Sequence, residues 1–279
     1  MRNLAEKVML VNLRISQWSG RAYDEEVTMQ VERDHSATNA GRYTKILIDE
    51  DALKDTQKIA NKARKFCNRE TLPWTDNGDR ILPATNYFSF MRDYQKLVTD
   101  FDKAVATFIG TYPVLKAEAR YRLNGLFKDD DYPDPNVIRL KFKMKVGILP
   151  INNLDDFRLK VSAEEVNHLR HQMEQEISDR VSEANRSLWI RIKEPIERMV
   201  DRLSQEDVTF RNSLVGNIEE LIDLIPRLNF TEDDHLEDIV HDLKALVVNP
   251  DDLRDDSRLR RQTAREAKAV LDKVNDFLY

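Results

Sequence analysis

Apolar and polar residues alternate most regularly between residues 138 and 148. Apolar side chains occupy every second position from Ile138 to Ile148, and the positions between them are basic as far as Lys145. Strict alternation of this kind is typical of a β-strand with one buried face. A shorter run of the same pattern extends from Phe157 to Val161. Because only a short polar loop separates the two runs, they predict a β-hairpin.

The N-terminal third predicts two further strands, at residues 11–16 and 27–31, because apolar residues again occupy alternate positions there. Helical periodicity predicts helices over residues 51–67 and 88–109. Gly110 and Pro113 are expected to break or kink the second helix, which then resumes as far as Asn124.

A helix of about forty residues is predicted from Ser162, with Glu165 completing a capping box. Its apolar positions repeat every eleven residues, which gives a nearly straight seam along a helix about 60 Å long. One seam is too narrow for full burial, so we expect an antiparallel partner helix, a second subunit, or both. Pro195 is expected to kink this helix near Arg191. The candidate self-association seam is Val166, Met173, Ile177, Ala184, Leu188, Ile192 and Met199.

Shorter helices are expected at about 207–225, 232–247 and 251–278. The predicted fold class is α+β, mainly α: a long helical hairpin or bundle with a small antiparallel β-sheet at one end. The sheet would combine the N-terminal strands with residues 137–149 and 157–161. We therefore divide the chain into an N-terminal strand-plus-helix region (1–135), a basic β-hairpin (136–161) and a long-helix bundle (162–279).

Composition supports long exposed helices, because 34% of the residues are charged and only 7 are glycine. The net charge of −6 gives no global attraction to nucleic acid or membrane, so any such attraction must be local. The single cysteine, Cys67, excludes an internal disulfide framework and fits a reducing compartment. No apolar run approaches the length of a membrane span, so we expect a cytoplasmic protein without a membrane partner.

The predicted hairpin carries an entirely basic face, formed by Arg139, Lys141, Lys143, Lys145, Arg158 and Lys160. Bare like charges on one small surface repel, so an anionic partner is expected. Nucleic-acid phosphate, an acidic surface of this chain or of a partner, and protection of an exposed strand edge all remain open. Phe142 and Phe157 point to the apolar side, which counts against stacking of single-stranded bases on this face.

A second charge pattern occurs near the C-terminus, where Arg254, Arg258, Arg261 and Arg265 follow one helix face. The stretch from Leu214 to Asp242 is strongly acidic and includes Asp234 and Asp238. We expect these opposite charges to face one another, within the chain or between subunits, and to set register more than stability.

Two histidine-containing helix faces could hold a divalent metal: Asp234 and Asp238 with His241, and Glu164 with His168 and His171. Solvated helix faces explain both better, because acids are favoured at helix N-termini and no specific metal motif is present. Phosphate-binding glycine loops and nucleophile motifs are also missing from the sequence, and Cys67 fits a buried structural role. We therefore predict a non-enzymatic protein with no cofactor.

Four stretches resemble a family of uncharacterised proteins from tailed phages: "QWSGRAYDEEVT", "RLNGLFKDDDYPDP", "FRNSLVGNIEELIDLIPRLNFTEDDHLEDI" and "LRDDSRLRRQTAREAKAVLDKV". Genes of that family often lie near those for a MoxR-type AAA+ ATPase and a von Willebrand A-type protein. The resemblance implies an adaptor or substrate of a remodelling ATPase, in the cytoplasm of the infected bacterial host. It supplies no catalytic residues. The positions that match are Phe210, Arg211, Asn217, Asn229, Asp233, Leu253, Arg254 and Arg261.

The leading functional hypothesis is a phage interaction or assembly protein that forms a homo-oligomer through its long helices. The alternative is a protein that binds single-stranded DNA or RNA through the basic sheet face.

Overall fold

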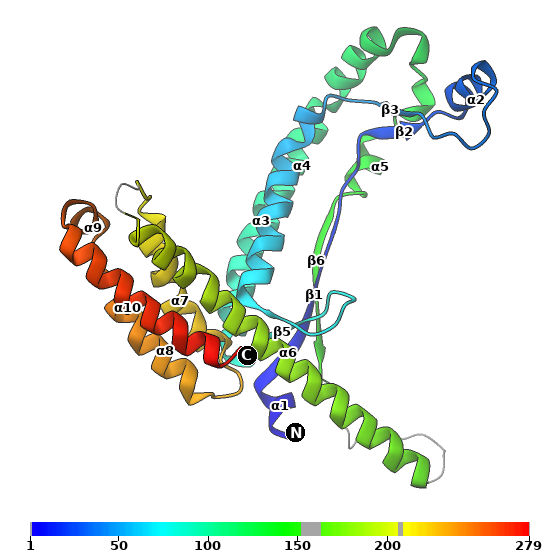
Figure 1. The fold of residues 1–279 in the computed structure, drawn as a ribbon. Coiled ribbons are helices and arrows are strands. Elements are labelled where there is room, and N and C mark those ends of the chain that lie inside the picture. Colours follow the sequence, from blue (N-terminus) through cyan, green and yellow to red (C-terminus); the bar gives the residue numbers. More distant parts are fainter. Residues whose placement is uncertain (1, 152–162, 206–208, 279) are drawn as a thin grey trace. The chain divides into compact units, whose positions relative to one another are not determined.

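The computed structural model describes residues 2–151, 163–205 and 209–278 (Figure 1). The chain forms two compact units. Unit 1 comprises Met1–Asn12, Cys67–Phe90 and Gly147–Tyr279, and unit 2 comprises Leu13–Phe66 and Met91–Val146. These units cut across the expected division at residues 135 and 161, because segments distant in sequence pack together within each unit.

Four strands form a small sheet in the order β4 (Leu72–Pro73), β5 (Arg80–Pro83), β1 (Val8–Ser16) and β6 (Lys143–Pro150). Strands β1 and β5 are antiparallel, with Leu10 opposite Ile81. The predictions of a mainly α fold with a small antiparallel sheet and of a strand at 11–16 are confirmed. The expected strand at 157–161 lies outside the described residues.

Strand β6 begins at Lys143, so the prediction of a strand from residue 137 is wrong. The segment before it is helix α5 (Pro135–Arg139), where the Asp134 carboxylate accepts a hydrogen bond from the Asn136 amide at 2.8 Å. An Asp N-cap followed by proline at the first helical position favours a helix start. This local capping outweighs the alternation of apolar residues.

The predicted strand at 27–31 is also wrong, because these residues lie in helix α2 (Glu25–Asp34). The Asp24 side chain caps this helix by accepting a hydrogen bond from the Val27 amide at 3.1 Å. Glu25 and Glu26 in the first turn favour the helix dipole.

The helices expected at 51–67 and 88–109 are confirmed as α3 (Lys54–Glu70) and α4 (Tyr87–Leu123). Helix α4 continues through Gly110 and Pro113, although Pro113 removes one backbone hydrogen bond. Buried Phe108, Tyr112 and Ala119 flank the proline, so packing within unit 2 holds the helix on both sides. Helix α4 ends before Asn124, which has a left-handed φ of 44°.

Unit 1 contains the predicted helical bundle. The long helix α6 (Ala163–Leu203) packs against α7 (Ser213–Leu228) and α10 (Ser257–Asp276), and α8 (Asp234–Ala245) packs against α7 and α10 (Figure 1). Helix α6 continues through Pro195, where a kink was expected. In the described residues, no helix combines the length and apolarity that crossing a membrane requires.

The remaining elements are short: α1 (Arg2–Lys7), β2 (Arg21–Tyr23), β3 (Thr44–Ile46), η1 (Glu50–Leu53), η2 (Ala84–Asn86), η3 (Asn124–Leu126), η4 (Asp129–Asp131) and α9 (Pro250–Asp255). Strands β2 and β3 pair with each other in a separate two-stranded sheet within unit 2.

Candidate nucleic-acid interface

Four cations of the predicted basic face follow one another in unit 2, and we call them the basic strip. Arg139 ends α5, Lys141 lies in the following turn, and Lys143 and Lys145 belong to β6; all four are exposed. The alternate residues Phe142 and Met144 are buried. The centre of the Phe142 ring lies 5.7 Å from the ring centre of Phe108 and 6.4 Å from that of Phe101, both on α4. The apolar side chains that alternate with the basic strip therefore pack against α4. The other two predicted members, Arg158 and Lys160, lie outside the described residues.

Among the described residues, the basic strip has no carboxylate partner. Across residues 2–151, 163–205 and 209–278, no acidic side chain lies within ion-pairing distance of any of its four cations. Three other cations of unit 2 do have carboxylate partners: Lys128 lies 2.9 Å from Glu26, and Lys116 and Arg120 each lie 3.2 Å from Asp129. The hydrogen bond from Lys116 lowers the pKa of Asp129, so that carboxylate is already engaged.

A second basic face, which we call the lysine face, lies on helix α3 within unit 2. Lys58, Lys62 and Lys65 are spaced by four and three residues and are all exposed. None of the three has a carboxylate partner in the described part of the chain. This face was not predicted from the sequence, although lysines at i, i+4 and i+7 in "KIANKARK" indicate a basic helix face.

Charge is distributed unevenly between the two units. Unit 2 holds 21 basic and 17 acidic residues, whereas the rest of the chain holds 23 basic and 33 acidic residues. The net charge of −6 therefore conceals a positively charged unit. Local positive potential of this kind attracts polyanions regardless of the total charge.

The candidate self-association seam divides into two parts along α6. Ala184, Leu188, Ile192 and Met199 are completely buried in the core of unit 1. Val166, Met173 and Ile177 are partly exposed, and Ile177 packs against the same core. The second half of the seam is therefore core of the bundle and offers no surface to a second subunit.

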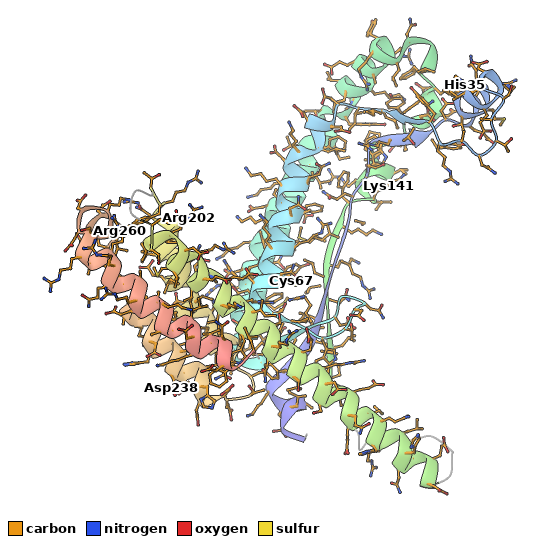
Figure 2. All side chains as sticks on the ribbon, in the orientation of Figure 1. His35, Cys67, Lys141, Arg202, Asp238 and Arg260 are labelled. Atoms are coloured by element: carbon orange, nitrogen blue, oxygen red, sulfur yellow. The ribbon has the colours of Figure 1, made fainter. Side chains whose placement is uncertain are left out.

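The acidic residues of α8 and the arginines of α10 lie at different ends of the bundle. Asp242 of α8 pairs with Lys273 at 2.6 Å, and the His235 ring lies 4.7 Å from Phe277, so α8 runs beside the C-terminal half of α10. Figure 2 shows Asp238 and Arg260 correspondingly far apart in unit 1. The expected register of Asp234 and Asp238 with the arginines is not formed among the described side chains.

The arginines have other surroundings. Arg254 pairs with Asp251 and donates hydrogen bonds to the Phe210 carbonyl oxygen and the Asn212 side chain. Arg258, Arg261 and Arg265 are exposed and lack a carboxylate partner within the described ranges. Backbone hydrogen bonds from Leu259 and Arg258 lower the pKa of the helix-capping Asp256.

The two possible metal faces are placed on solvent-accessible helix surfaces. His168 and His171 are exposed on α6, and His241 of α8 lines a cavity of about 500 Å³ against α7. No three His, Cys, Asp or Glu side chains converge as metal ligands in the parts of the chain that the structure describes.

Cys67 is buried near the end of α3. Burial raises the pKa of its thiol, and the smaller opposing effect of Arg80 does not reverse this. A protonated buried thiol is a poor nucleophile.

Comparison with known proteins assigns a family. A family model with the description "Protein of unknown function (DUF3150)" matches residues 5–223, which is most of the chain. No curated protein and no solved structure was found to match it. The chain therefore belongs to the DUF3150 family of proteins of unknown function.

Proposed function

We propose that this protein binds nucleic acid through unit 2, with the basic strip as the central contact. The observation that carries the proposal is the exposure of Arg139, Lys141, Lys143 and Lys145 without any carboxylate partner in the described residues. Lysine and arginine neutralise backbone phosphates and release counterions, which supplies the main part of non-specific nucleic-acid affinity. The lysine face adds three similar cations on the same unit.

The alternatives for the basic strip are less well supported. An acidic surface of the same chain does not cover it in the described residues. Self-association through α6 loses most of its basis, because four of the seven seam residues are buried in their own bundle. The homo-oligomer therefore remains a prediction that rests on three partly exposed residues.

The resemblance to tailed-phage proteins adds a setting to this proposal. It implies that the protein acts in the cytoplasm of an infected bacterial host and works with a MoxR-type AAA+ ATPase. A nucleic-acid-binding adaptor would be compatible with such a partner. Both the setting and the ATPase remain predictions.

The test is binding of a labelled single-stranded oligonucleotide, followed by fluorescence anisotropy at low salt and during a salt titration. We expect affinity to fall steeply with salt. Lys141/Lys143/Lys145→Glu should remove most of the binding. Milder neutralisation with Lys141/Lys143/Lys145→Gln should reduce the slope of log K against log salt by about 2, since each single-strand phosphate contact contributes about 0.7.

A matched control is available in unit 1. Arg258/Arg261/Arg265→Glu changes the net charge by the same amount at three exposed arginines that also lack carboxylate partners in the described structure. This control should retain most of the affinity. Absence of binding at low salt, or an equal loss in the control, would contradict the proposed function.

A further inference from the structure

The two-stranded sheet of unit 2 has one solvent-exposed face. Strands β2 and β3 pair with Arg21 opposite Ile46 and Tyr23 opposite Thr44. Because side chains alternate along a strand, these four residues share one face. Tyr23 is 51% exposed and Ile46 is 41% exposed. The opposite face carries the buried Lys45.

Two arginine side chains contact residues of this face. The Arg42 guanidinium lies 5.9 Å from the centre of the Tyr23 ring, and Arg122 donates a hydrogen bond to the Ile46 carbonyl oxygen at 2.9 Å. Neither arginine has a carboxylate within ion-pairing distance in the described chain. Arg21, in contrast, is neutralised by Glu50. The face therefore combines an accessible aromatic ring with two cations that no carboxylate of the described residues neutralises.

Hydrogen bonds and ion pairs fix the buried face of this sheet. Lys45 donates hydrogen bonds to the Leu126 carbonyl oxygen at 3.2 Å and lies 2.8 Å from Asp24 and 2.5 Å from Asp131. The buried Tyr132 hydroxyl donates to the Leu47 carbonyl oxygen at 2.8 Å, immediately after β3. A ring carried by such a fixed sheet loses little conformational entropy on stacking, which favours a binding role.

We propose that this face is a base-stacking subsite for single-stranded nucleic acid, with Tyr23 stacking on a base and Arg42 and Arg122 contacting the adjoining phosphates. The inference rests on the proposed function and deepens it by specifying a single strand. Successive bases stack on aromatic side chains in proteins that bind single strands without strong sequence preference. Strands β2 and β3 belong to unit 2, as does the basic strip. The subsite supplies the aromatic contact that the strip itself lacks.

The experiment compares two oligomers, each about 16 nucleotide units long. One is oligothymidylate, and the other is an abasic oligomer with the same phosphodiester backbone. Wild-type protein should bind oligothymidylate more tightly than the abasic oligomer. Tyr23→Ala should weaken oligothymidylate binding by about fivefold to a hundredfold, the range expected for one lost stacking contact. The same variant should leave the affinity for the abasic oligomer within about twofold of wild type.

Two further variants separate ring stacking from other effects. Tyr23→Phe retains the ring and should bind both ligands like wild type. Phe88→Ala removes an exposed aromatic of unit 1, which is 82% exposed, and should change neither affinity. Circular dichroism of each variant verifies that unit 2 remains folded.

The outcomes distinguish the two proposals. If wild-type protein binds neither oligomer at low salt, the proposed function itself fails. If it binds both, but Tyr23→Ala weakens them equally or not at all, polyanion binding stands and the stacking subsite is refuted. A Tyr23→Phe variant as weak as Tyr23→Ala would also refute stacking, because the ring would then be insufficient.

Discussion

Lys45 and Asp24 form an ion pair of 2.8 Å in which the side chains are only 1% and 2% exposed. Asp24 also caps α2, and Asp131 supplies a second carboxylate at 2.5 Å from the same ammonium group. The pair therefore joins three segments of unit 2 that are distant in sequence. Removing one partner of a buried pair leaves an uncompensated charge, which is more costly than losing the pair itself.

We expect Lys45→Met to lower the free energy of unfolding of unit 2 by about 3–5 kcal/mol, because Asp24 would remain buried without its cation. The measurement is urea denaturation together with hydrogen exchange of the α2 and β3 amides. Lys128→Met is the matched control, since it breaks an exposed pair with Glu26 that solvent already screens, and it should lower the stability far less than Lys45→Met. Equal effects of the two variants would show that burial does not determine the cost.

The same pair predicts how stability depends on pH. The hydrogen bond from Lys45 lowers the pKa of Asp24 below its ordinary value of 3.8, so its contribution is present above that value and is lost as pH falls through the lower folded pKa. Burial lowers the pKa of Lys45, but hydrogen bonds to Asp131 and Asp24 outweigh this and raise it overall. The lysine contribution is therefore present below 10.5 and is lost as pH rises through the higher folded pKa.

Unit 2 should accordingly be most stable on a plateau between these limits. Asp24→Asn should be less stable than wild type at pH 6, and the difference should shrink as the pH falls towards 2. Thermal melts at several pH values measure this difference. If the stability difference between wild type and Asp24→Asn grew as the pH fell, the predicted sign of the pH dependence would be wrong.

Helical periodicity predicted the buried face correctly where that face packs in the core of the bundle. The bundle buries Leu188, Ile192 and Met199 along one face of α6, so the apolar seam visible in the sequence is the seam that packs. What periodicity could not decide was the partner. The same seam suits a second subunit or helices α7 and α10, and only the folded chain distinguishes them.

Alternation was misleading at two helix starts. Residues 27–31 and 137–142 alternate like strands, but Asp24 caps the helix that contains the first stretch, and Asp134 caps the helix that includes the start of the second. Both capping residues were visible in the sequence, so these errors came from giving alternation more weight than capping. The pairing of β1 with β5 joins residues about seventy positions apart, and no local pattern specifies such a pairing.

The candidate site was predictable in part. Arg139, Lys141, Lys143 and Lys145 are exposed as expected, although the backbone carrying the first two is not a strand. Tyr23 was not recognised, because its exposure follows from the pairing of β2 with β3 and from the burial of Lys45 behind them. Surface exposure of this kind depends on tertiary structure.

The buried carboxylate of Glu70 in unit 1 is neutralised by two arginines, which can be removed singly or together. This carboxylate is 3% exposed and lies 2.7 Å from Arg227 and 2.9 Å from Arg69, with the Asn86 amide donating at 3.2 Å. After loss of one arginine, the other still pairs with Glu70. Arg227→Met or Arg69→Met alone should therefore lower the free energy of unfolding by about 1 kcal/mol. The double variant leaves a buried carboxylate without a cation and should cost about 3–5 kcal/mol, more than the sum.

A double-mutant cycle by urea denaturation measures this coupling. Adding Glu70→Gln to the double variant should recover part of the lost stability, because the uncompensated charge is removed. Strictly additive single effects, or no recovery with glutamine, would argue against shared neutralisation of Glu70.

Thiol accessibility provides a test for the end of α3. Because Cys67 is buried and its pKa is raised, native protein at pH 8 should react with a thiol reagent at least a hundredfold more slowly than protein unfolded in urea. Reaction followed by absorbance gives both rates. A native rate close to the unfolded rate would mean that this part of unit 1 opens readily.

The two roles considered for the α6 seam predict different consequences of one substitution. Leu188 is completely buried, so Leu188→Glu places a charge in the core of unit 1 and should unfold the bundle. Circular dichroism and mass photometry, measured on the same samples, separate loss of fold from loss of assembly. Arg186→Glu, at an exposed position two residues earlier on α6, is the control and should leave the fold intact. A Leu188→Glu protein that stays fully helical while its particle mass decreases would instead place Leu188 at a subunit interface and contradict its burial in the core of unit 1.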